Sequence, residues 1–361
     1  MAHAGAVDDG DDGAGAGETD EEVRLLSVSW NQDSTRFAAA TTADLRFFAC
    51  GGGDGGGGIR ETAPRVPRGG GGFAVAEMLF RSDLFVAAVG AGTATTLEVL
   101  DAPTGRRYCE HRLPSAVRAV RVSRRHLAVV LDRAIRVYDL RDPARPPLWK
   151  IATALNRRGL CCLSCHAGAA VLACPGTARG EVRVDDLGSK AATKLIAAHA
   201  SDLACIAMPA DGTVLATASV TGTVVRVFST IDGTLLHELR RGLATAVIHS
   251  IALSQNLEWL AVSSNKHTLH VFSLRARNGC DEQSSIKGIL PNYFGYYLQR
   301  SFAQFYLPEV TRYVVAFGEQ NTVMVIGMDG SFCRCSFDPV NGGEMVRKEY
   351  FRFFKNKRTS N

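Results

Sequence analysis

The segment Leu239-Arg240-Arg241-Gly242 places two guanidinium groups next to each other in the chain. Guanidinium groups bind phosphate through paired, charge-assisted hydrogen bonds. In an extended segment, neighbouring side chains point to opposite sides of the backbone. A single polyanion site would more naturally space its cations by two residues. Arg240 and Arg241 therefore predict two separate phosphate-binding pockets, one on each side of the segment.

Small polar side chains and imidazoles flank the arginine pair on both sides in the sequence. Short hydroxyls and ring nitrogens place the further hydrogen bonds that phosphate oxygens accept. The upstream candidates are His199, Ser219, Thr223 and Arg226, and the downstream candidates are Ser263, Ser264, Thr268 and His270. Internal hydrogen bonds of the fold are an alternative role for the Ser, Thr and His side chains. Alternatively, the two arginines cover a solvated edge of the fold.

Short apolar or alternating runs, separated by turn residues, fill the chain from about residue 25 onward. They are rich in β-branched and aromatic residues and four to eight residues long, which is typical of strands. The runs recur at steps of 42, 44 and 45 residues, measured between Val120, Cys162, Ile206 and Ile251. A four-stranded unit of that period is a propeller blade, whereas a solenoid would need two helices per repeat.

These repeats predict an all-β protein, a seven-bladed β-propeller that spans residues 23–354. The blades are expected to start near residues 25, 73, 117, 160, 203, 247 and 302. The Trp-Asp dipeptide of WD repeats is absent, and Tyr138-Asp139 is the nearest equivalent. The blades are therefore interpreted as degenerate WD-like repeats.

Composition distinguishes three further segments. Residues 1–22, rich in Gly, Ala and acids, predict a disordered acidic tail, residues 51–72 a Gly-rich flexible loop, and residues 355–361 a basic C-terminal tail. The formal charge is +5, and the first 22 residues hold eight acids and no Lys or Arg, so residues 23–361 carry +13. Such a body favours anionic partners. Nucleic acid is not expected, because base-stacking aromatics interleaved with Lys and Arg are not seen.

Several classes of function are disfavoured by missing motifs. No run of about 18 apolar residues occurs and the N-terminus does not read as a secretory signal, so any membrane contact should be peripheral. The ten cysteines are expected to be reduced thiols. Cys162-Leu-Ser-Cys165-His166 formally fits a haem-attachment pattern, but it falls where an inner strand is expected. We expect no metal, no cofactor and no enzymatic activity, since no nucleophile elbow or acid–base carboxylate pair is evident.

The arginine segment resembles the Phe/Leu-Arg-Arg-Gly motif of the PROPPIN family, the β-propellers that bind polyphosphoinositides. The likeness extends through residues 199–207, 215–219, 222–228 and 236–242, and to 317–319 and 343–347 near the end. It implies two headgroup sites on the rim, in blades five and six, for phosphatidylinositol 3-phosphate and 3,5-bisphosphate. Arg240 would serve the first site with the upstream candidates, and Arg241 the second with the downstream candidates.

The resemblance also implies a membrane-contacting loop at about residues 275–300, with Ile286, Ile289 and Leu290 as inserting side chains. Alternatively, the aromatic residues of this segment begin blade seven and pack inside. The implied function is recruitment of other autophagy proteins during autophagosome formation. The protein would be a monomer in solution, cytoplasmic, and peripheral on preautophagosomal, endosomal or vacuolar membranes. A WD-like scaffold for protein–protein interaction, without lipid binding, is the alternative function.

Overall fold

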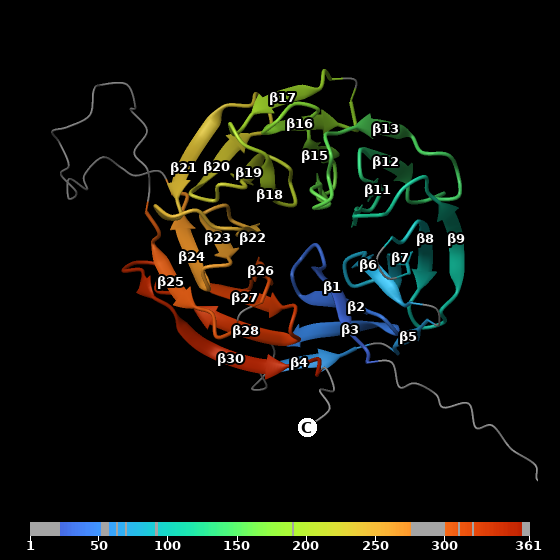
Figure 1. Ribbon diagram of the computed structural model, residues 1–361, viewed down its shortest axis with the longest axis horizontal. Helices are drawn as coiled ribbons and strands as arrows, with labels where there is room; N and C mark the ends of the chain where they lie inside the picture. Colours follow the sequence, from blue (N-terminus) through green and yellow to red (C-terminus); the bar gives the residue numbers. More distant parts are fainter. Residues whose placement is uncertain are drawn as a thin grey trace, which may run out of the picture.

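Seven sheets make up the computed structural model of the chain, and they are arranged around a common axis as the blades of a β-propeller (Figure 1). Their strands pair antiparallel, except for one short parallel pair at the edge of the sixth sheet. The structure describes residues 22–51, 58–62, 64–68, 71–90, 93–189, 191–275, 300–309, 311–319 and 321–355. The four strands of each of blades 2 to 5 pair in chain order, and short additional or intervening strands modify this order in blades 1, 6 and 7. The prediction of an all-β, seven-bladed propeller is confirmed.

The first four blades come from residues 25–197. Blade 1 contains β1 (Leu25–Trp30), β2 (Arg36–Thr41), β3 (Asp44–Gly51), β4 (Gly58–Glu61) and the short β5 (Val66–Pro67). Blade 2 contains β6 (Phe73–Met78), β7 (Leu84–Val89), β8 (Thr96–Asp101) and β9 (Arg107–Arg112). Blade 3 contains β10 (Ala119–Val122), β11 (His126–Val130), β12 (Ala134–Asp139) and β13 (Trp149–Ala152). Blade 4 contains β14 (Cys162–Leu163), β15 (Val171–Pro175), β16 (Glu181–Asp186) and β17 (Lys194–Ala197).

The last three blades complete the ring. Blade 5 contains β18 (Leu203–Ala207), β19 (Val214–Ser219), β20 (Val224–Ser229) and β21 (Leu235–Arg240). Blade 6 contains β22 (Ile248–Leu253), β23 (Trp259–Ser264), β24 (Thr268–Ser273), β25 (Ala303–Tyr306) and β29 (Gly343–Glu344). Blade 7 contains β26 (Tyr313–Phe317), β27 (Thr322–Gly327), β28 (Ser331–Ser336) and β30 (Val346–Arg352). Contacts of β26 with β1, and of β30 with β4, close the ring.

Six of the seven blades start within two residues of their predicted positions, and blade 7 does not. Residues 303–306 form β25, which pairs with β24 as the outer strand of blade 6. Blade 7 begins only at Tyr313. The prediction of a start near residue 302 was wrong because a long insertion separates β24 from its partner strand, and the repeat period no longer applies across it.

The glycine-rich range 51–72 also differs in part from a plain flexible loop. The strands β4 and β5 lie within this range, and both pair with β3. A strand at the outer edge of a blade is held by backbone hydrogen bonds, which require no apolar side chains. Composition alone therefore gave no indication of these two strands.

Packing between blades follows from the alternation of side chains along each strand. In blade 5, one face carries apolar residues that pack on apolar residues of blade 6. This cluster contains Ala216, Ala218, Val225, Val227 and Leu239 from blade 5, and Ile248, Ile251, Leu260, Val262 and Phe272 from blade 6. The opposite face of each blade packs against the preceding blade in the same way. Every blade thus contributes to two interfaces.

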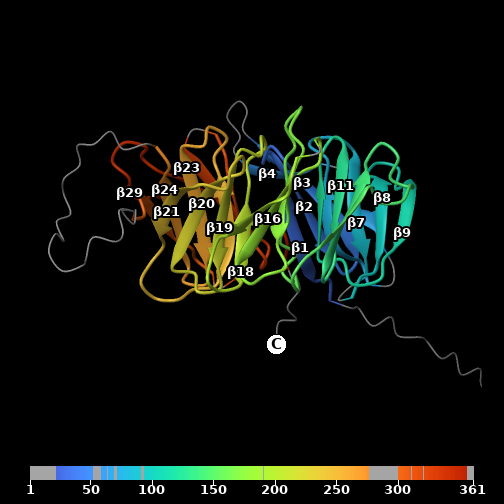
Figure 2. The ribbon, with the colours of Figure 1, turned by 90° about the horizontal axis from the view of Figure 1, so that it is seen from above.

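The antiparallel order also decides which loops share a face of the disc. The strands run between the two faces of the disc (Figure 2). Loops that join the second and third strands of a blade therefore emerge on the same face as loops that lead to the next blade. We call this face the junction face. In blades 5 and 6 it is formed by residues 220–223, 241–247, 265–267, 307–309 and 311–312.

Candidate functional site

The candidate residues of blade 5 lie where its second, third and fourth strands reach the junction face. In the β20–β21 ladder, Val224 pairs with Arg240, Val225 with Leu239 and Arg226 with Glu238. Residues that pair across a ladder share a face. Arg240 therefore shares a face with Arg226, whereas Leu239 belongs to the cluster that packs on blade 6. Arg240 is on the side that faces blade 4.

The seam between blades 4 and 5 is a polar cluster. His199 Nε2 lies 2.9 Å from Thr217 Oγ1. Arg226 donates to the carbonyl oxygen of Ala198 at 2.7 Å and to Glu238 Oε2 at 2.7 Å. Burial lowers the pKa of His199 to about 4, and the positive charge of the nearby Arg226 guanidinium contributes to this shift as the second largest cause. The imidazole is therefore neutral at pH 7 and has capacity to accept a proton when an anion binds beside it.

Arg240 brings an unsatisfied donor to this seam. Its Nε is buried and has no hydrogen-bond partner in the described part of the chain. Buried polar atoms are almost always paired, so an orphaned guanidinium nitrogen needs a specific explanation. Ser219, which is buried at the end of β19, is on the same face as Thr217, because the two are separated by one residue on a strand. A ligand with anionic oxygens would satisfy this Nε.

Arg241 faces the other way and serves the seam between blades 5 and 6. Its side chain is 9% exposed. Its Nε donates to the carbonyl oxygen of Gly222 at 2.8 Å, and its Nη2 donates to that of Ala244. Its backbone N–H donates to the carbonyl oxygen of Thr223 at 2.9 Å. Burial lowers the pKa of Arg241. The Nε and Nη2 of this guanidinium therefore hold the loops together, and its Nη1 makes no hydrogen bond with the described residues.

The blade 6 side of this seam carries the matching residues. His270 pairs with Val262, and Val262 packs against blade 5. Thr268 and Ser264 lie two residues from these positions on β24 and β23, and so they share the face toward blade 5. Burial, and to a lesser extent the nearby Arg241 guanidinium, lowers the pKa of His270 to about 4. Its Nδ1 is buried and has no hydrogen-bond partner among the described residues. The second seam thus also contains an unsatisfied buried nitrogen beside an arginine.

Ser263 does not belong to this set. It lies next to Ser264 on β23 and therefore points to the opposite side of the sheet, toward blade 7. Its hydroxyl donates to the carbonyl oxygen of Tyr313 at 3.0 Å, and the residue is fully buried. Its role is a structural hydrogen bond between blades 6 and 7. The alternation that separates Arg240 from Arg241 separates the two serines as well.

Two residues of the first seam were absent from the sequence prediction. Thr217, fully buried, orients His199, and Glu238 forms an ion pair with Arg226. The position of Glu238 two residues before Arg240 on one strand was the signal available in the sequence. This carboxylate matters because it neutralises a cation beside the proposed phosphate pocket.

Other predicted features fall elsewhere. Ile286, Ile289 and Leu290 lie outside the described residues. The described residues contain no helix whose length and hydropathy would allow it to cross a membrane. Within the same residues, no group of three or more His, Cys, Asp or Glu side chains is placed to hold a metal ion, and this includes Cys162, Cys165 and His166.

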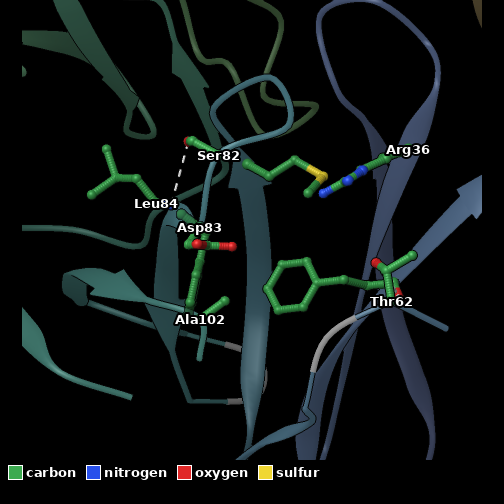
Figure 3. Close-up of a pocket in the computed structure, with 9 residues that line it drawn as sticks. Arg36, Thr62, Ser82, Asp83, Leu84 and Ala102 are labelled. Atoms are coloured by element: carbon green, nitrogen blue, oxygen red, sulfur yellow. Dashed lines mark hydrogen bonds between the residues drawn. The ribbon is translucent and has the colours of Figure 1, made fainter. Parts of the chain in front are cut away.

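A small cavity lies between blades 1 and 2, far around the ring from the candidate site (Figures 1 and 3). It has a volume of about 40 Å³. Arg36, Thr62, Ser82 and Asp83 line it together with apolar side chains. A space of this size holds one or two water molecules. It is too small for an inositol phosphate, so it is not a second candidate for the ligand site.

The PROPPIN family model matches residues 24–314. The chain belongs to the PROPPIN family. Among curated members, "Autophagy-related protein 18e" of Arabidopsis thaliana is 42% identical over 354 residues, 95% of this chain and 92% of that protein. "WD repeat domain phosphoinositide-interacting protein 2" of Mus musculus is 37% identical over 266 residues, 73% of this chain and 57% of that protein.

Solved PROPPIN-like propellers share the fold at low sequence identity. A structure of Kluyveromyces lactis Hsv2 has a TM-score of 0.75 and 18% identity, and the match covers 92% of this chain and 100% of that chain. A structure of a complex of KlAtg21 with the coiled-coil of AgAtg16 has a TM-score of 0.71 and 23% identity, with coverage of 92% and 100%. These similarities agree with the seven-bladed fold of this PROPPIN.

Proposed function

We propose that this PROPPIN binds phosphoinositide headgroups at two sites, one at each seam of blade 5. Arg240, with His199, Ser219 and Arg226, forms the first site. Thr223, predicted for this site, lies two residues before Val225, which packs on blade 6, and so it belongs to the side of Arg241. Arg241, with Ser264, Thr268 and His270, forms the second site. The observation that carries the proposal is that the adjacent guanidinium groups lie on opposite faces of the blade. Among the described residues, the Nε of Arg240 and, beside Arg241, the Nδ1 of His270 are buried without a hydrogen-bond partner. The names of relatives, which include "phosphoinositide-interacting" and "autophagy-related", support it.

Two weak sites on one rigid disc are sufficient for membrane recruitment. A phosphate held by two or three charge-assisted hydrogen bonds gains about 1.5–3 kcal/mol from each. Once one headgroup is held, the second binds at a high effective concentration, so the avidity for a membrane exceeds either single affinity. The basic body adds attraction to an anionic leaflet. We propose phosphatidylinositol 3-phosphate and 3,5-bisphosphate as the ligands.

The protein then acts as a peripheral recruitment scaffold on preautophagosomal, endosomal or vacuolar membranes, without enzymatic activity. Its partners would be other autophagy proteins, in keeping with the KlAtg21 structure, in which that propeller is in complex with the coiled-coil of AgAtg16. The competing function is a propeller scaffold that binds proteins and no lipid. Among the described residues, no group of three or more His, Cys, Asp or Glu side chains is placed to hold a metal ion for catalysis.

The stoichiometry of headgroup binding tests the proposal. Isothermal titration with inositol 1,3-bisphosphate, the soluble headgroup of phosphatidylinositol 3-phosphate, should give two sites per chain for the native protein. Arg240→Gln and Arg241→Gln should each leave one site, and the double variant should not float with vesicles that carry this lipid. Arg133→Gln changes an exposed arginine of blade 3 and serves as the matched control. Absence of binding by the native protein, or two sites in either single variant, would overturn the proposal.

A further inference from the structure

We propose that the loop of residues 241–247, on the junction face, is a membrane-contacting element whose tip, Leu243, enters the bilayer interface. This inference rests on the proposed function, since it assumes that the two seams of blade 5 hold lipid headgroups. It concerns a part of the chain distinct from the segment 275–300, in which the resemblance implies a membrane-contacting loop.

The loop is held in a fixed shape by bonds at both of its ends. Arg241 donates to the carbonyl oxygens of Gly222 and Ala244, and so it fastens the loop to blade 5 and to itself. The backbone N–H of Val247 donates to Asn265 Oδ1 at 2.9 Å, and Asn265 N–H donates to the Val247 carbonyl at 3.0 Å. A loop fixed at both ends loses little conformational entropy when it docks.

Gly222 makes the close approach of this loop possible. Its φ of +65° is in the left-handed region, and a Cβ at this position would collide with the carbonyl oxygen of Ala246. Ala246 N–H donates to the carbonyl oxygen of Thr221 at 3.1 Å. The loop and residues 220–223 thus pack backbone against backbone.

The tip exposes apolar side chains. Leu243 is 83% exposed, the highest value among the large hydrophobic residues of the described chain. Val247, at the end of the loop, is 45% exposed, and Val220 in the neighbouring loop is 39% exposed. A fully exposed leucine on a rigid loop has no role in the core. Three such side chains on one face, beside a ligand site, indicate a surface that is covered when the ligand is bound.

The charges around the tip select an anionic bilayer as the occupant. Arg240, Arg241 and Lys266 lie at this part of the junction face, and none of them forms an ion pair with a described residue. The nearby acid in residues 307–309, Glu309, is paired with Arg352. Aliphatic side chains among unpaired cations are typical of segments that enter the headgroup region of anionic membranes.

Chain geometry places the tip where the bilayer surface must lie. Leu243 follows Arg240 by three residues and Arg241 by two, so its Cα is within about 10 Å of both along the chain. If those arginines hold the headgroups of two lipids, the hydrocarbon boundary is about one headgroup away. A leucine side chain that projects from this loop reaches that boundary. A protein partner would have no such link to the headgroup sites.

The test separates membrane contact from headgroup binding. Leu243→Ser should weaken partition to phosphatidylcholine vesicles that carry phosphatidylinositol 3-phosphate about tenfold, which is the scale for removing one partly buried leucine. Its affinity for soluble inositol 1,3-bisphosphate should not change. Leu155→Ser alters an exposed leucine on the same face between blades 3 and 4, and should change neither. A Leu243→Trp variant should show a blue shift of its fluorescence on these vesicles, and quenching by brominated lipid.

Each alternative outcome overturns the inference. Vesicle binding of Leu243→Ser equal to that of Leu155→Ser would show that the tip does not enter the membrane. An equal loss of vesicle and soluble-headgroup binding would make Leu243 part of the pocket. No spectral shift for Leu243→Trp would place the tip in water. If a protein partner bound to the native protein and not to Leu243→Ser, the surface would be assigned to that partner. If the native protein fails to bind the soluble headgroup, the proposed function itself fails.

Discussion

The two arginines should have different effects on stability although both contribute to ligand binding. The Nε of Arg240 is buried and has no partner among the described residues, so replacement by Gln removes an unsatisfied donor and breaks no side-chain hydrogen bond that those residues show. Arg241 donates to the carbonyl oxygens of Gly222 and Ala244. Its replacement leaves both carbonyls without this donor. We therefore expect Arg241→Gln to destabilise the fold and Arg240→Gln to leave it unchanged.

The size of this difference follows from the bonds that are lost. A hydrogen bond to a charged group contributes about 1.5–3 kcal/mol net. Two such bonds set an upper range of about 3–6 kcal/mol, and opening of the loop alone reduces this, so we expect about 2–4 kcal/mol. The melting temperature of Arg241→Gln should fall by several degrees. Arg240→Gln should stay within about 0.5 kcal/mol of the native protein.

Thermal unfolding and hydrogen exchange measure the two parts of this prediction. Backbone amides of residues 220–223 and 241–247 should exchange faster in Arg241→Gln and at the native rate in Arg240→Gln. Arg241→Lys keeps the charge but not the forked geometry, so it should resemble Arg241→Gln in exchange. Equal stability and equal exchange of Arg240→Gln and Arg241→Gln would refute the structural role of Arg241. In that case, a loss of lipid binding by the variant with both arginines replaced could be assigned to the ligand sites without correction for partial unfolding.

Three further predictions use the same two seams. Burial lowers the pKa of both site histidines to about 4, from 6.5 in an unfolded chain, so the unfolded state binds more protons between these values. The contribution of these two histidines to stability should therefore be complete above pH 6.5 and be lost as the pH decreases toward 4. Replacing both by Gln should reduce the dependence of the melting temperature on pH across that window, and an unchanged slope would contradict the reasoning. Ser263→Ala should cost about 1 kcal/mol in chemical denaturation and leave headgroup titration unchanged, whereas Ser264→Ala should weaken the titration; the reverse result would place Ser263 in the site. Glu238→Gln should free Arg226 and tighten headgroup binding severalfold, and weaker binding would show that the carboxylate is needed to orient the guanidinium.

The ring could be predicted from sequence because each blade repeats one local pattern. Strand alternation and turn residues recur at about 43 residues, so six inner strands were placed to within two residues. Blade 7 was misplaced because β25 is distant in sequence from its partner β24. Pairing over such a separation leaves no local signal. The edge strand β4 was hidden for a different reason, since its composition is that of a loop.

The candidate site could be predicted in outline only. The types of its residues follow from phosphate chemistry, and the adjacent arginines require two pockets. The burial that makes His199 and His270 neutral, and the ion pair of Arg226 with Glu238, depend on how the blades pack. Ser263 was included through residue type, although alternation along β23 excludes it once Ser264 is placed. Face assignments therefore carry more information than lists of polar residues.

One irregularity in β21 decides which arginine serves which seam. Phe228 pairs with Leu235 but Val227 pairs with His237, so Leu236 is an extra residue in the strand. Such a bulge reverses the alternation between the two halves of the strand. If the ladder continued without it, Glu238 would oppose Val225 and Arg240 would face blade 6. The bulge thus assigns Arg240 to the seam with blade 4 and Arg241 to the seam with blade 6. Alternation alone predicts two pockets, but only the register of this ladder determines their order.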